Sequence, residues 1–284
     1  MKKDSNSALV PFRSKVSHGQ ISGIQSKGTS SQSPPTLLLH SAGGGSHSLA
    51  TMAAMLRTEG HVLIPDLDGY GQTWLSACAN PQLNALAAHR QVIDSVLGEV
   101  LEPQQSVVIV GHSMGGFLGL LTAMADKWPV SAVVAIEPVA FSVLDPVEDA
   151  AARAEDLEKV MALSAAVKAG APEAALGDFI GYWGNTEWEA LGKTMRSALL
   201  KLAPQIARET FAVAHDTTQP DQYKKLNLPV LLLQGADTVA PAIAVINRLQ
   251  ALLLHVEVQR IPNTAHMGPV RQPNVYASII NEFI

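Results

Sequence analysis

The chain has 284 residues, 47% of them hydrophobic and 16% charged, so it is long enough to bury the core of one large α/β domain. Its formal net charge of −5 and its lack of a basic cluster argue against nucleic acid or an anionic membrane surface as the main partner. These values favour a small, uncharged or weakly charged molecule as the substrate.

Cys78 is the only cysteine, so neither an intrachain disulfide nor a cysteine-based zinc site can form. The H-E-x-x-H spacing of a metal-binding helix is also absent, and the sequence predicts no metal site. The first residues lack the long apolar run of a secretion signal, and no later run is long enough to span a membrane. These features predict a cytoplasmic protein that does not associate with a membrane.

The first third of the chain predicts a β-hairpin followed by alternating strands and helices. Residues 8–24 alternate polar and apolar side chains around Ser17-His18-Gly19, which indicates a hairpin at a sheet edge. Short apolar runs at 36–39 and 61–64 indicate buried strands, with a helical pattern between them. A further helix is predicted from about Leu83 to Leu101.

The alternation continues to about residue 140, is interrupted, and resumes near residue 229. The interrupted stretch, 141–226, is rich in Ala, Glu, Lys and Leu and has no strand-like run, which predicts an inserted helical cap. The remaining predicted strands are 106–110, 132–136, 229–233 and 256–261, and helices are predicted at 117–124, at about 243–253 and after Pro273. The predicted fold class is therefore α/β, a mainly parallel central sheet with helices on both faces, formed by residues 1–140 and 227–284, with the cap at 141–226.

The five residues Gly111-His112-Ser113-Met114-Gly115 fit the G-x-S-x-G pattern, which places a nucleophilic serine on a sharp turn between a strand and a helix. A β-branched run precedes the motif, and apolar residues at helical spacing follow it. Such a turn requires glycines because neighbouring backbone passes close to it. Ser113 is therefore the predicted nucleophile.

A serine hydroxyl needs a base within hydrogen-bond reach and an acid that orients the base. His266 follows the last predicted strand, in a loop at the carboxyl edge of the sheet, and is the candidate base. Asp237 follows the strand before it and gives the chain order Ser, Asp, His, so it is the preferred acid. Glu137, at the carboxyl end of the predicted strand 132–136, is the alternative acid.

The oxyanion of a tetrahedral intermediate needs hydrogen-bond donors. The backbone N–H of Met114, directly after the nucleophile, is expected to be one of them. The other is expected from the glycine-rich segment His40-Ser41-Ala42-Gly43-Gly44-Gly45, where Ala42 is the first choice. In the predicted cap, large rings stand among Gly and Ala, and they either anchor the core of the cap or form the wall of an acyl pocket: Phe179, Tyr182, Trp183 and Trp188. Trp183, beside Gly184 at a predicted helix end, is the ring expected to line the pocket.

Taken together, His40 to Gly45, the segment Pro65 to Thr73, the serine motif, Gly235-Ala236-Asp237 and Ala265-His266 resemble the α/β-hydrolase superfamily over nearly the whole chain. The resemblance implies nucleophile Ser113, acid Asp237 and base His266, a variable helical lid, and no organic cofactor. The sequence departs from the family pattern at two places. Ser41 stands where relatives have glycine, which leaves the second oxyanion donor open between Ala42 and Gly43, and the turn before Asp237 is one residue shorter than usual, which keeps Glu137 as an alternative.

A serine at this turn resembles esterases, lipases and thioesterases rather than superfamily members with an aspartate nucleophile. The leading hypothesis is a serine hydrolase that cleaves a small carboxylic ester or related acyl compound through an acyl-enzyme. One alternative is hydrolysis of a carbon–carbon bond in a dicarbonyl compound, which similar folds perform with the same three residues. The other is a catalytically idle, ligand-binding member of the fold.

Overall fold

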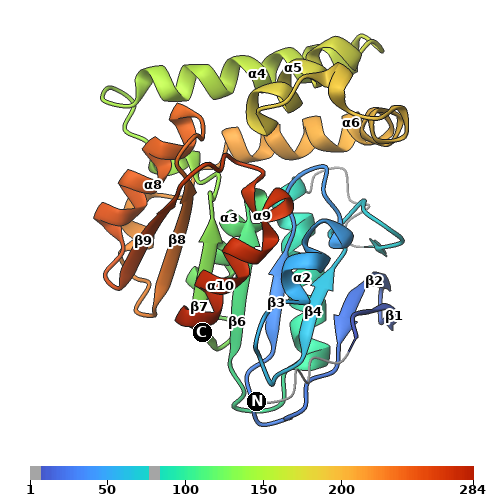
Figure 1. Cartoon of the computed structure of the whole chain (residues 1–284), viewed down its shortest axis with the longest axis vertical. Helices are drawn as coiled ribbons and strands as arrows, with labels where there is room; N and C mark the ends of the chain where they lie inside the picture. The colour runs from blue at the N-terminus through green and yellow to red at the C-terminus, as the bar shows by residue number, and fades with distance from the viewer. Residues whose placement is uncertain (1–7, 77–83) are drawn as a thin grey trace.

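The structure is a computed structural model that describes residues 8–76 and 84–284, so Cys78 and the predicted start of a helix at Leu83 lie outside the described residues. Within them, nine strands form one sheet in the order β1-β2-β4-β3-β6-β7-β8-β9, with β5 paired to β2 (Figure 1). The strands are β1 Val10–Val16, β2 Gly19–Ser26, β3 Thr36–Leu39, β4 Val62–Pro65, β5 Trp74–Leu75, β6 Val107–His112, β7 Val130–Ile136, β8 Val230–Gly235 and β9 Val256–Ile261.

The six strands from β4 to β9 along this order pair in parallel, whereas β1 pairs with β2, and β2 with β4, in antiparallel fashion. The predicted α/β class and the mainly parallel sheet are thus confirmed. Every residue of β3, β4 and β8 is buried, because helices cover both faces of the sheet. The short strand β5 has no counterpart among the predicted elements.

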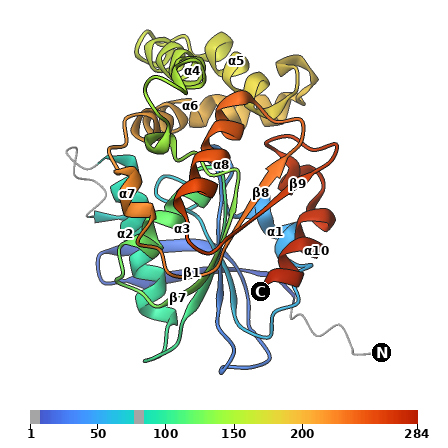
Figure 2. The same ribbon diagram turned by 90° about the vertical axis from the view of Figure 1, so that its left-hand side faces the viewer.

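Helices pack on both faces of the sheet, and alternate strand residues point to one or the other. Leu37 and Leu39 belong to the core that includes helix residues Val92 and Phe117, whereas Leu38 belongs to the core on the opposite face. Figure 2 shows α2 and α3 on one side of the sheet and α1 and α10 on the other. The helices are α1 Ala50–Ala53, preceded by the 3-10 turn η1 Ser46–Leu49, then α2 Ala85–Val100, α3 Met114–Met124, α8 Ala240–Leu252, α9 Gly268–Arg271 and α10 Pro273–Phe283.

A separate layer of helices lies beyond the carboxyl ends of the parallel strands, at the top of Figure 1. It consists of α4 Ala150–Lys168, α5 Glu173–Gly184 and α6 Lys193–Ala214, which we call the α4–α6 layer. The short turns η3 Phe141–Val143 and η4 Trp188–Ala190 and the helix α7 Pro220–Tyr223 complete the segment 141–226, which contains no strand.

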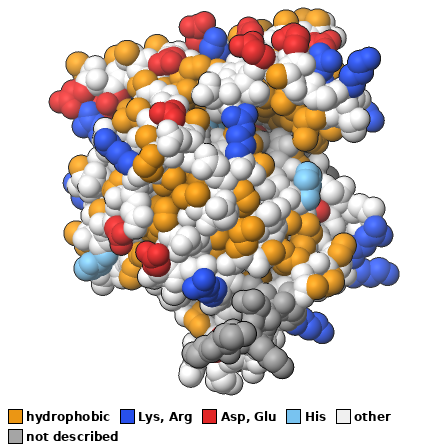
Figure 3. Space-filling view, viewed as in Figure 1, with side chains coloured by type: hydrophobic (Ala, Val, Ile, Leu, Met, Phe, Trp, Pro, Cys, Tyr) orange, Lys and Arg blue, Asp and Glu red, His pale blue; other side chains and the backbone are white. Residues whose placement is uncertain are grey.

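The α4–α6 layer differs from the sheet domain in its surface as well as its position. On the face shown in Figure 3, acidic side chains gather along the outer edge of this layer, and fewer lie over the sheet below.

Across the described part of the chain, no helix is both long and apolar enough to cross a lipid bilayer.

Candidate active site

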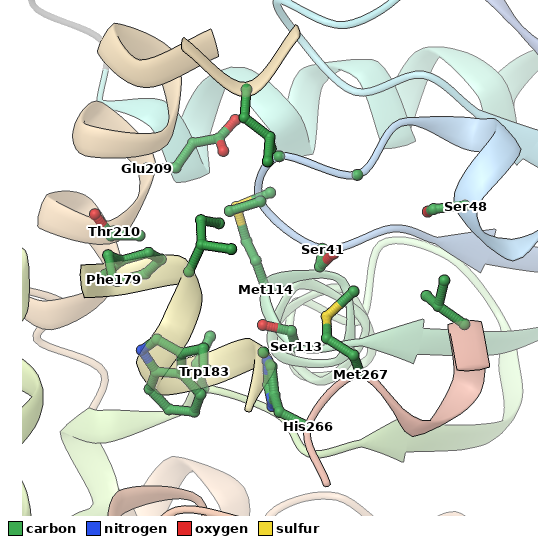
Figure 4. Close-up of a pocket in the computed structure, with 18 of the residues that line it drawn as sticks. Ser41, Ser48, Ser113, Met114, Phe179, Trp183, Glu209, Thr210, His266 and Met267 are labelled. Atoms are coloured by element: carbon green, nitrogen blue, oxygen red, sulfur yellow. The ribbon is translucent and has the colours of Figure 1, made fainter. Parts of the chain in front are cut away.

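Ser113 occupies the sharp turn between β6 and α3. Its backbone has φ 56° and ψ −118°, a conformation that costs energy for a residue with a side chain and is characteristic of a nucleophile held at a turn. The backbone N–H of Ser113 donates to the carbonyl of Ile136, at the end of β7, over 2.8 Å. The turn is thereby fixed to the neighbouring strand, and the Ser113 side chain reaches the cavity above the sheet edge (Figure 4).

Gly111 and Gly115 allow backbone to pass close on both sides of this turn, as predicted. A Cβ atom at Gly111 would collide with the backbone of Gly115, and a Cβ atom at Gly115 would collide with the carbonyl of Leu39 on β3. Because no side chain fits at either position, these two glycines permit the tight approach of α3 to the sheet.

His266 lies in the loop between β9 and α9, beside Ser113 in the same cavity (Figure 4). Its ring is buried, and its Nδ1 lies 2.8 Å from Oε2 of Glu137. An ionised carboxylate only accepts hydrogen bonds, so Nδ1 carries the proton in this contact. In the neutral ring Nε2 then holds a lone pair, which is the state a general base requires.

Glu137 is buried directly after β7, with a positive φ of 44° that turns its side chain across the end of β8. Besides His266, it accepts hydrogen bonds from the backbone N–H of Gly235 over 2.7 Å and from the hydroxyl of Thr238 over 2.7 Å. These three donors offset the cost of burying a carboxylate. They also hold it in one orientation toward the imidazole.

Asp237, the acid preferred from the sequence, forms no hydrogen bond or ion pair with His266. Its side chain is exposed, and only its backbone N–H ties the turn to the loop of His266, by donating to the carbonyl of Thr264 over 2.8 Å. The end of β8 presents Gly235 and Thr238 to Glu137, and Asp237 between them faces solvent. The structure thus corrects the preferred assignment, because the alternative acid, Glu137, holds the imidazole.

His112, one residue before the nucleophile, fixes the backbone of the histidine loop. Its Nε2 lies 2.8 Å from the carbonyl oxygen of His266, and the centroids of the two rings are 5.0 Å apart. Burial, together with the nearby His266, lowers the pKa of His112 to about 3, so its ring is neutral and donates Nε2–H to that carbonyl. The sequence pattern gave no indication of this role.

In the loop after β3, the hydrogen bonds distinguish between Ala42 and Gly43, the two candidates for the second oxyanion donor. The backbone N–H of Gly43 donates to the hydroxyl of Tyr70 over 2.7 Å and is therefore already used. Among the described residues, none accepts a hydrogen bond from the N–H of Ala42 or from that of Met114, the first residue of α3. Both Ala42 and Met114 line the cavity next to Ser113.

Tyr70 links this loop to the α4–α6 layer. Its hydroxyl donates to Glu209 on α6 over 2.6 Å while it accepts from Gly43. Glu209 is fully buried, receives a second hydrogen bond from Gln205 over 2.6 Å, and lies 3.0 Å from Nε2 of His89 on α2. Buried Glu209 thus fixes the position of the Tyr70 hydroxyl, which in turn accepts the hydrogen bond from Gly43 that holds the glycine-rich loop.

A cavity of about 530 Å³ lies between the sheet edge and the α4–α6 layer and contains Ser113 and His266 in its wall (Figure 4). Of the aromatic residues near α5, Phe179 and Trp183 line the cavity, whereas Trp188 packs against Gly177. The centroids of the Trp183 and His266 rings are 4.6 Å apart. The ring selected from the sequence therefore stands directly beside the candidate base.

Within residues 8–76 and 84–284, no three His, Cys, Asp or Glu side chains are grouped as the ligands of a metal ion would be. The polar groups at the Ser113 end of the cavity include a hydroxyl, an imidazole and two free backbone N–H groups. This set is suited to nucleophilic attack on a carbonyl carbon.

Comparison with known sequences gives one match over most of the chain and several partial ones. The sequence model described as "Alpha/beta hydrolase family" matches residues 36–279. Protein phosphatase methylesterase 1 of Mus musculus is 31% identical over 102 residues, which are 35% of this chain and 26% of that protein. The chain thus matches only about a quarter of the length of this relative.

Solved structures show the same fold at low sequence identity. A bacterial membrane phospholipase A superposes with a TM-score of 0.75 at 18% identity, over 97% of this chain and 86% of that one. The naproxen esterase of Bacillus subtilis superposes with a TM-score of 0.66 at 15% identity, over 97% of this chain and 91% of that one. With the family sequence model matched over residues 36–279, the chain belongs to the alpha/beta hydrolase family.

Proposed function

We propose that this protein is a serine hydrolase that cleaves a small carboxylic ester with Ser113, His266 and Glu137 as its catalytic residues. The observation that carries the proposal is the arrangement around His266. Its Nδ1 is held by Glu137 at 2.8 Å, and the ring stands beside a serine in a strained turn. The partial similarity to a methylesterase supports an ester as the bond that is cleaved.

In the proposed reaction, Nε2 of His266 takes the proton of Ser113 as Oγ attacks the ester carbonyl. The tetrahedral intermediate places its oxyanion at the free N–H groups of Ala42 and Met114. Collapse of the intermediate breaks the bond to the alkoxide, which receives the proton from the imidazolium and leaves as an alcohol. A water molecule then attacks the acyl-enzyme by the same steps, releases the carboxylic acid and restores Ser113.

Glu137 has two functions in this mechanism. Its hydrogen bond to Nδ1 selects the tautomer with a free Nε2, and its negative charge stabilises the imidazolium formed during attack. The donors from Gly235 and Thr238 keep the carboxylate in place throughout both half-reactions. No proton has to move to Glu137.

The α4–α6 layer acts in this proposal as the cap over the active site, and its wall selects the acyl or alcohol group. Phe179, Val160 and Leu199 come from its three helices and make the cap side of the cavity largely apolar. A cavity of about 530 Å³ suits a small molecule rather than a polymer.

The proposal is tested by labelling with a fluorophosphonate probe, peptide mapping, and turnover of p-nitrophenyl esters of increasing acyl length. We expect labelling at Ser113, ester turnover, and loss of both in Ser113→Ala. Ser48→Ala is the matched control, because Ser48 also lines the cavity but its hydroxyl donates to the carbonyl of Gly45. Ester turnover that persists in Ser113→Ala, or labelling without turnover of any ester, would overturn the proposal.

A further inference from the structure

Asp156 is a buried acid in the cavity wall that the proposed mechanism does not use. It lies on α4, is only 4% exposed, and lines the cavity together with Val160, one helical turn further along. None of the described residues forms a hydrogen bond or an ion pair with its carboxylate. The side chain therefore has unused capacity to accept hydrogen bonds from a bound molecule.

Burial of an unpaired carboxylate is unfavourable, because it removes the ionised form from water. In Asp156, burial alone raises the pKa to about 7, because no cation among the described residues lies near enough to favour the ionised form. Among the described residues that line the cavity, Arg271 is the single Lys or Arg, and it is exposed on α9. A positively charged ligand group would supply the missing partner.

The other acid in the cavity wall is already satisfied. Glu209 receives hydrogen bonds from Tyr70 and Gln205 and lies beside His89. Asp156 is thus the acid that remains available to a ligand, while Glu209 adds negative potential to the same cavity. The contrast between the two carboxylates indicates that Asp156 is not held by the fold.

Aromatic rings from α5, which packs against α4, complete the environment of a cation site. Phe179 and Trp183 line the same cavity, and both are less than one-tenth exposed. The faces of such rings attract ammonium groups, most strongly where water is excluded.

We propose that Asp156, together with the rings of Phe179 and Trp183, binds an ammonium group, so that the enzyme hydrolyses esters that carry a positively charged nitrogen. This inference rests on the proposed ester hydrolysis and specifies its substrate class. The net charge of −5 would also favour the approach of such a substrate.

The experiment compares two pairs of esters that differ in charge but hardly in shape. In the first pair, the acyl chain of a p-nitrophenyl ester ends in a trimethylammonium group or in a tert-butyl group. In the second pair, choline butanoate is compared with the ester in which a tert-butyl group replaces the trimethylammonium. We expect kcat/KM to favour the charged ester by at least about tenfold in one of the pairs.

Two variants assign this preference to a residue. Asp156→Asn should abolish the preference for charge, whereas Asp178→Asn, an exposed acid on the same layer, should retain it. Equal kcat/KM within both pairs for the wild-type enzyme, or a preference that survives in Asp156→Asn, would overturn the inference. Circular dichroism of both variants verifies that they are folded.

Binding of benzyltrimethylammonium to the wild-type protein, measured by calorimetry, needs neither a variant nor turnover. We expect saturable binding that slows fluorophosphonate labelling of Ser113. If the cation binds but no ester is hydrolysed, the proposed function fails and the ammonium site stands. If neutral esters are hydrolysed but the cation does not bind, the ammonium site fails alone.

Discussion

The carboxylate of Glu137 and Nδ1 of His266 are 2.8 Å apart, although 129 positions separate the two residues in the chain. Glu137 directly follows β7 and His266 follows β9, so the contact spans the end of the intervening strand β8. Gly235 at the end of β8 donates to the same carboxylate and supports it across this gap. The carboxyl ends of three parallel strands, β7, β8 and β9, thus meet at the pair formed by Glu137 and His266.

This relationship predicts the effects of two substitutions. Glu137→Gln should lower kcat for ester hydrolysis on the order of 10⁴-fold, because the amide no longer selects the productive tautomer or stabilises the imidazolium. Asp237→Asn should change kcat less than about threefold, because its side chain is exposed. Steady-state kinetics of both purified variants make the comparison, and the reverse order would return the acid to Asp237.

Much of this site could be predicted from the sequence because its signals are local. The apolar run before Gly111 and the helical spacing after Gly115 specify a strand, a turn and a helix, and Ser113 follows from them. The choice of acid is different. It depends on the positive φ of Glu137 and on which residues of the β8 turn face inward, and neither property is encoded in a short pattern.

The sequence predicts a helical segment where the α4–α6 layer lies, but the residues of this layer that face the cavity differ in how far a pattern identifies them. Trp183 could be selected because a large ring among glycines suggests a pocket wall. Asp156 could not, because α4 is rich in charged residues and a single acid in it is usually exposed. Only the packing of α4 against its neighbours shows that this acid faces the cavity.

The link between Tyr70 and the glycine loop predicts a change in both rate and stability. Tyr70→Phe removes the acceptor of the Gly43 N–H and a donor to buried Glu209. We expect the free energy of unfolding to fall by about 1–3 kcal/mol, and kcat to fall about tenfold because the loop that carries Ala42 is less well fixed. Denaturant unfolding and ester kinetics measure the two effects. Unchanged kcat would show that the loop does not depend on Tyr70.

Substitution of Trp183 and of Trp188 should have different effects, because Trp183 lines the cavity and Trp188 does not. Trp183→Ala should shift the preferred acyl length of p-nitrophenyl esters and change the relative kcat/KM by about 1–3 kcal/mol, because it removes cavity wall. Trp188→Ala is the matched control, since this ring packs against Gly177 away from the cavity. It should lower the melting temperature and leave the length profile unchanged. A Trp183→Ala enzyme with the wild-type profile would contradict a role in substrate selection.

His112 predicts a loss of stability in acid. Its pKa is lowered from 6.5 to about 3 in the folded protein, so the folded state binds fewer protons than the unfolded state between these values. The stabilisation is present above about pH 6.5 and is lost as the pH falls toward 3. His112→Gln keeps a donor for the His266 carbonyl but does not titrate. Between pH 7 and pH 4, the free energy of unfolding of the wild type should fall by about 2–3 kcal/mol relative to this variant. Parallel curves would show that His112 is not buried neutral.

Asp156 predicts a pH dependence of the opposite sign. Its pKa is raised from 3.8 to about 7, so between these values the folded state binds more protons than the unfolded state. Its contribution to stability is therefore complete below about pH 4 and is lost as the pH rises through about 7.

Asp156→Asn has no proton to lose, so the variant should gain stability relative to the wild type as the pH rises from 4 to 8. The expected gain is about 2–4 kcal/mol, measured by denaturant unfolding at several pH values without ligand. The exposed Asp178→Asn serves as control and should show no such trend. Bound benzyltrimethylammonium should reduce the difference, because a cation beside Asp156 stabilises its ionised form in the folded protein. A difference that is independent of pH would mean that Asp156 meets water or a cation in the folded protein and is not a buried, unpaired acid.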